Sequence, residues 1–128
     1  MWGKPPFNIA DNCAVDVRDL IAAKEWYIEK LGLHESKTHR EEDSGRPFAD
    51  LHISNYDDVF LSLVELEPSA SAKNRHIIFF TKNLDKAHQW LAVRGVAVEP
   101  TSTDSGGNRL FCLHDLEGNI IEVCVEPG

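Results

Sequence analysis

Two stretches of this chain decide its fold: VRDLIAAKEWYIEKLGL at residues 17–33 and TKNLDKAHQWLAVRGV at residues 81–96. In each, a polar helix-capping residue comes before apolar residues at helical spacing, and a Gly ends the helical pattern. The Trp of the second stretch, Trp90, lies 64 positions after Trp26 of the first (90 − 26 = 64). Such self-similarity predicts two copies of one structural unit.

Strand-like segments surround both predicted helices. They are residues 9–17, 34–41, 48–54 and 59–66 in the first copy, and 76–80, 96–99, 109–114 and 120–125 in the second. Each copy then reads βαβββ, which predicts an α+β fold in which the two sheets face one another around an open, barrel-like cavity. We expect one domain over residues 1–128, made of modules 9–67 and 75–126 and joined by a short polar linker.

Composition excludes several classes of protein. The formal net charge is −8 and the acidic residues are scattered, which argues against nucleic acid or an anionic membrane surface as a partner. The sequence has no apolar run of the roughly 20 residues that cross a bilayer and no signal-peptide core. Cys13, Cys112 and Cys124 each lie in an apolar segment, so we expect reduced thiols and a cytoplasmic location.

The chain resembles the vicinal oxygen chelate superfamily, which includes glyoxalases, bleomycin-resistance proteins and extradiol dioxygenases. Residues 17–33, 76–79 and 113–123 carry the resemblance, which extends roughly from Ile9 to Val125. The most specific piece is LHDLEGNIIEV, residues 113–123. The family usually has Asp-Pro-(Glu/Asp)-Gly-Asn there, followed by a strand that bears a Glu, whereas this chain has Leu116 in place of Pro.

The resemblance implies a glyoxalase-like domain and, in many members, a divalent metal held by the first and last strands of each module. By sequence register these positions are Asn12 and Leu63 in the first copy, and His76 and Glu122 in the second. The implied ligands are therefore His76, Glu122 and Asn12. Glu65 is a further candidate, because it lies two residues beyond Leu63 on the same strand face.

Strand alternation tests whether these residues can meet. Ile121 and Val123 form an apolar row that suits packing under a helix, so Glu122 and Cys124 are expected on the opposite face, toward the cavity. A buried Glu is costly unless it is paired, protonated or bound to metal. An imidazole with a carboxylate suits Zn, Mn, Fe, Co or Ni. An open alternative is that His76 merely lines the cavity and that Glu122 pairs with Arg109.

Further side chains are candidates for binding a substrate. Arg109 suits an anionic group, and the loop 101–108, with Ser105 and Asn108, suits a mobile flap that donates hydrogen bonds. His52, Phe80 and Cys124 are expected to line the cavity.

Two functions from different classes follow. The resemblance implies a divalent-metal-dependent enzyme of lyase, thiol-transferase or dioxygenase type, which stabilises an oxyanion and in which Glu122 is catalytic. Leu63 suits the three-ligand pattern of fosfomycin-resistance thiol transferases. The alternative is a metal-free drug- or metabolite-binding protein of bleomycin-resistance type, with which the net charge of −8 is compatible. Both imply a small-molecule ligand and a homodimer.

Overall fold

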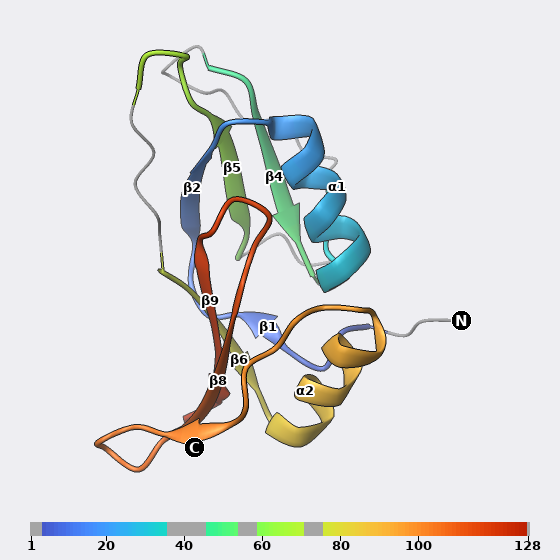
Figure 1. Cartoon of the computed structure of the whole chain (residues 1–128), viewed down its shortest axis with the longest axis vertical. Coiled ribbons are helices and arrows are strands. Elements are labelled where there is room, and N and C mark those ends of the chain that lie inside the picture. The colour runs from blue at the N-terminus through green and yellow to red at the C-terminus, as the bar shows by residue number, and fades with distance from the viewer. Residues whose placement is uncertain (1–3, 36–45, 54–58, 71–75, 128) are drawn as a thin grey trace.

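The computed structural model describes residues 4–35, 46–53, 59–70 and 76–127, and they form two sheets with one helix against each (Figure 1). The first module holds β2 (Cys13–Val17), α1 (Leu20–Leu31), β3 (His34–Glu35), β4 (Phe48–His52) and β5 (Leu61–Glu65), with sheet order β2-β5-β4-β3. The second holds β6 (His76–Thr81), α2 (Leu84–Val93), β7 (Ser102–Thr103), β8 (Arg109–His114) and β9 (Ile120–Val125), and β1 (Asn8–Ile9) joins its sheet in the order β1-β6-β9-β8-β7. This is the predicted α+β fold of two sheets.

The first predicted strand, residues 9–17, is in fact two strands that belong to different sheets. β1 pairs antiparallel with β6, whereas β2 pairs parallel with β5, and the chain bends between them. Side chains stabilise the bend: Asp11 Oδ1 accepts a hydrogen bond from Asn12 N (2.9 Å), and Asn12 Oδ1 accepts one from Phe60 N (2.9 Å). Such bonds compete with a continuous strand ladder.

Two other strands differ from expectation. The segment 96–99 makes a single bridge, from Val98 to Leu113, rather than a strand. β7 instead forms within the predicted flap and pairs with β8. Of the predicted strand 34–41, residues 34–35 form β3, and residues 36–41 lie outside the described residues.

Both helices begin and end where the capping residues predict. Asp19 accepts a hydrogen bond from Ala22 N at the start of α1, and Asn83 accepts one from Lys86 N at the start of α2 (both 3.0 Å). Gly32, directly after α1, has φ 73°, the left-handed conformation that favours glycine. Neither helix of the described chain has the length and apolar character to cross a membrane.

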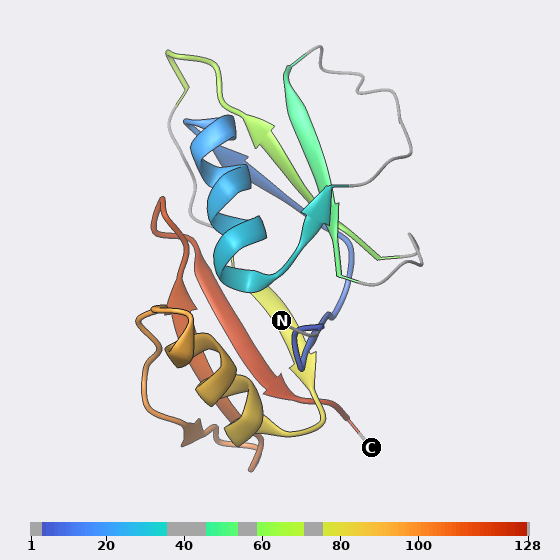
Figure 2. The same cartoon turned by 90° about the vertical axis from the view of Figure 1, so that its right-hand side faces the viewer.

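Both helices cover the same side of the two sheets (Figures 1 and 2). Their buried faces, which include Tyr27 and Leu31 of α1 and Leu91 of α2, pack on alternate strand residues such as Phe79 and Phe111. The opposite sheet face is therefore left for the site.

The β8–β9 hairpin turn of the second module makes hydrogen bonds to α1 of the first module and to the two residues just before that helix. Tyr27 Oη donates a hydrogen bond to the buried Asp115 (2.6 Å). Glu117 accepts hydrogen bonds from the main-chain N–H groups of Arg18 (2.6 Å) and Asp19 (3.0 Å). The most family-specific piece of the sequence, residues 113–123, thus joins the two modules.

Candidate functional site

A cavity of about 450 Å³ lies where the bend between β1 and β2 meets β6 and β9. Its lining residues are Ala10, Asp11, Asn12, Cys13, His76, Ile78, Phe80, Glu122 and Cys124. Five of the predicted site residues are therefore brought together: Asn12, His76, Phe80, Glu122 and Cys124. The strand alternation that placed Glu122 on the face away from the helix is confirmed.

His76 and Glu122 contact one another inside this cavity. β6 and β9 run parallel, with His76 opposite Ile120 and Ile78 opposite Glu122, so the two polar side chains lie diagonally across neighbouring strands. His76 Nε2 is 3.2 Å from Glu122 Oε1, a hydrogen-bonding distance. The Glu122 side chain is 20% exposed and that of His76 53%. The imidazole thus satisfies a largely buried carboxylate that would otherwise be costly to desolvate.

Two thiols lie beside Glu122. Cys112 is opposite Glu122 on β8, and Cys124 is two residues further along β9. Burial, and secondly the negative charge of Glu122, raise the pKa of both thiols. Both thiols are therefore protonated at neutral pH, and a protonated thiol is a poor nucleophile.

Asn12 reaches the cavity from the other module. Its Oδ1 accepts the hydrogen bond from Phe60 N already described, so one lone pair of the amide oxygen is engaged and a second stays available. Within the described residues, no three His, Cys, Asp or Glu side chains are grouped closely enough to hold a metal ion. A metal here would rest on His76 and Glu122, with an amide as the third protein donor.

The predicted equivalence of Leu63 with Glu122 is wrong by one residue. Ala14 lies opposite Ser62 in the first sheet, and Ile78 lies opposite Glu122 in the second. Ile78 is the counterpart of Ala14 in the second module, 64 residues later (78 − 14 = 64), so their strand partners correspond as well, at an offset of 60 residues (122 − 62 = 60). Ser62, not Leu63, is therefore the counterpart of Glu122. Leu63 is fully buried in the core on the helix side.

Glu65 lies on that same helix side. Its Oε2 accepts a hydrogen bond from Leu20 N (3.3 Å), in the first turn of α1. A carboxylate at a helix N-terminus is favourably placed against the helix dipole. Glu65 is not among the residues that line the cavity, and the structure gives it a capping role instead.

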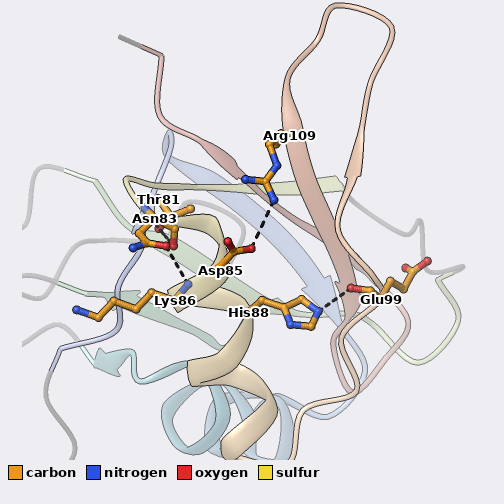
Figure 3. A network of polar contacts seen from close by, with 7 residues as sticks. All are labelled: Thr81, Asn83, Asp85, Lys86, His88, Glu99 and Arg109. Carbon is orange, nitrogen blue, oxygen red and sulfur yellow. Dashed lines mark hydrogen bonds and ion pairs between the residues drawn. The ribbon is translucent and has the colours of Figure 1, made fainter.

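Arg109 also lies away from the cavity. It lies on the same side of β8 as the buried Phe111, the side that faces α2, and its Nη2 is 3.4 Å from Asp85 Oδ1 (Figure 3). The alternative that Arg109 pairs with Glu122 is therefore wrong, because each has another partner. The same alternation was readable in the sequence.

The remaining predicted substrate residues are not brought to the cavity. Asn108 and Ser105 belong to an exposed turn closed by Asp104, whose Oδ1 accepts hydrogen bonds from Gly106 N and Asn108 N (both 2.9 Å). The bonds from Asn108 lower the pKa of Asp104. His52 is buried on β4.

His52 instead contacts a second histidine in the first module. Its ring lies 4.1 Å, centroid to centroid, from that of His34 on the neighbouring strand β3. Conversely, sequence reasoning missed Asp11, which adds a second carboxylate to the cavity wall. Only the bend at residues 10–12 brings Asp11 there, and the sequence pattern of residues 9–17 is that of an uninterrupted strand.

Comparison with known proteins bears on the whole chain. The sequence model of one protein family, the Glyoxalase/Bleomycin resistance protein/Dioxygenase superfamily, matches residues 9–123. No curated protein matches the sequence.

Solved structures resemble the fold at low sequence identity. A member of the same superfamily from Sphaerobacter thermophilus has a TM-score of 0.72 at 19% identity, over 91% of this chain and 96% of that one. TioX from Micromonospora sp. ML1 has a TM-score of 0.68 at 16% identity, over 92% of this chain and 99% of that one. Lactoylglutathione lyase from Agrobacterium tumefaciens has a TM-score of 0.67 at 17% identity, over 91% of this chain and 92% of that one. At such identities the likeness establishes the fold alone.

Proposed function

Because the chain belongs to the Glyoxalase/Bleomycin resistance protein/Dioxygenase superfamily, we propose that its cavity binds a small molecule and that His76 and Glu122 hold a divalent metal there. The activity would be of lyase, thiol-transferase or dioxygenase type. The observation that carries this proposal is the 3.2 Å contact between His76 Nε2 and Glu122 Oε1 at the cavity wall.

The donor atoms fit such an ion in kind. An imidazole nitrogen and a carboxylate oxygen suit Zn, Mn, Fe, Co or Ni, and the second lone pair of Asn12 Oδ1 suits a weaker third bond. When bound, the metal supplies Lewis-acid stabilisation of negative charge on substrate oxygens. Glu122 would in addition accept a proton from the substrate, and Ile78 and Phe80 would exclude water from that side.

Metal content tests the proposal. We expect purified protein loaded with Zn, Mn, Ni, Co or Fe to retain about one ion per chain, and His76→Ala or Glu122→Gln to lose it. His88→Ala is the matched control, because His88 lies on α2, on the helix side of the second sheet, where its Nε2 is 3.0 Å from Glu99 O. Wild-type protein that retains none of these ions, and whose melting temperature none of them changes, would contradict the metal site.

A specific observation favours a second candidate, metal-free binding of a cationic ligand. The described residues that line the cavity include the carboxylates of Asp11 and Glu122 but no Lys or Arg. Beside the aromatic Phe80, these charges suit an amine or another cation. If the metal test fails, titration with benzylamine against benzyl alcohol checks this function, and equal affinity for the two would contradict it.

A homodimer is part of the proposal. On the cavity face of the second sheet, Ile78 and Ile120 are each 39% exposed. These apolar side chains border a cavity that is open to solvent on this face of the single chain. A second copy of the chain that covers them would bury the apolar surface and close the cavity.

A further inference from the structure

A second pocket, of about 330 Å³, lies at the end of β6, beside the first turn of α2. Pro5, Phe7 and Phe80 give it apolar walls, and Lys82 and Lys86 give it two ammonium groups. Phe80 also lines the cavity that holds Glu122, so this side chain is common to both hollows.

The N-terminal wall of this pocket is held in place by side-chain contacts. The buried Thr81 donates a hydrogen bond from Oγ1 to the carbonyl of Pro6 (2.5 Å). Phe7 stacks on Phe79, with ring centroids 5.3 Å apart and planes inclined by 18°. The pocket is therefore built by packing rather than by a loose terminal segment.

The charge of the pocket is opposite in sign to that of the whole chain. Lys82 and Lys86 have no ion-pair partner among the described residues. Asp85, which lies between them in the sequence, pairs with Arg109 and points away from the Lys86 side chain (Figure 3). Glu126 at the edge supplies one negative charge, which leaves a formal +1 (2 − 1) in a chain of −8. The main-chain N–H of Lys86 is already satisfied by the Asn83 side chain, so attraction for an anion comes from the ammonium groups.

We propose that this pocket binds a small molecule that carries an anionic group, a carboxylate or a phosphate monoester, on a flat apolar body. Lys82 and Lys86 pair with the anion, while Pro5, Phe7 and Phe80 contact the body. The site does not depend on the proposed metal, because none of these lysines or prolines lines the larger cavity.

Phenyl phosphate is the probe. In a titration of the ¹⁵N-labelled protein, we expect its largest amide shifts at residues 7–8 and 80–86, and weaker binding as salt is raised. Lys82→Gln and Lys86→Gln should each weaken binding at least about threefold. Lys24→Gln removes the same charge from the other helix, where Lys24 pairs with Glu35, and should leave affinity unchanged.

Each competing result is decisive. Phenyl phosphate that shifts no amide in residues 80–86, or that binds Lys86→Gln as tightly as wild type, overturns the site. Benzyl alcohol that binds as tightly as phenyl phosphate overturns the role of the lysines. Inorganic phosphate that binds as tightly overturns the role of the apolar walls.

Discussion

Lys30 and Arg94 occupy equivalent positions in the two modules, 64 residues apart, and each donates a hydrogen bond to the main-chain carbonyl of the other. Lys30 Nζ lies 3.2 Å from Arg94 O, and Arg94 Nε lies 3.3 Å from Lys30 O. Arg94 also lies over the Trp90 ring, 4.3 Å from its centroid. Cations at helix C-termini oppose the negative end of the helix dipole, so this exchange stabilises both helix ends at once.

Arg94→Ala should therefore destabilise the protein. The change removes hydrogen bonds to carbonyls of α1 and the contact with Trp90, and we expect a loss of about 1–3 kcal/mol in the free energy of unfolding. Urea denaturation measures it. Lys82→Ala, an exposed lysine outside this contact, is the control, and an equal effect of the two substitutions would argue against the role of Arg94.

The Tyr27–Asp115 hydrogen bond predicts a loss of stability at alkaline pH. Burial, and secondly the charge of Asp115, raise the pKa of Tyr27 well above its ordinary value of about 10. A phenol whose pKa is higher in the folded than in the unfolded chain stabilises the fold below the unfolded pKa. That contribution is lost as pH rises, because the unfolded chain then ionises first.

Comparison with Tyr27→Phe isolates this effect. At pH 7 the variant should be about 1–3 kcal/mol less stable, because it leaves Asp115 without the phenol donor. The difference between wild type and variant should shrink as pH rises above about 10. Denaturation curves at several pH values check it, and a difference that stays constant with pH would contradict the assignment.

A change at Ile120 tests the dimer, because Ile120 is exposed on the cavity face but is not itself among the residues that line the cavity. Ile120→Asp would place a charge in the proposed interface, and we expect the dissociation constant of the dimer to rise at least about tenfold. Ile21→Asp is the matched control, because Ile21 is 67% exposed on α1, on the helix side. Light scattering over a dilution series gives the constants, and a wild-type monomer would sink the proposal.

How much was predictable depends on the distance along the chain over which each feature is decided. The helix caps at Asp19 and Asn83, and the placement of Glu122 on the strand face that lines the cavity, follow from local patterns, and they were predicted. The register of Ser62 was missed because the parallel pairing of β2 with β5 joins residues 48 positions apart (62 − 14 = 48). The bend that brings Asp11 into the cavity rests on the bond between Asn12 and Phe60, which is likewise non-local.

The last prediction concerns Gly32, where the N-terminal segment and the second module approach the end of α1. Gly32 has φ 73°, and a Cβ there would lie 3.0 Å from Trp90 Cη2 and 3.3 Å from Pro5 Cδ. Gly107 has φ 84°, but nothing lies within 4 Å of a Cβ built on it. Both glycines are in the left-handed region, and only Gly32 is crowded.

Alanine at the two positions therefore separates backbone strain from crowding. Gly107→Ala should cost about 1–2 kcal/mol from the backbone conformation alone. Gly32→Ala should cost that plus about 1–3 kcal/mol, because Trp90 or Pro5 must move. Unfolding free energies measure both changes. Equal costs would mean that Trp90 yields freely and that the contact between the modules is looser than the packing around Gly32 indicates.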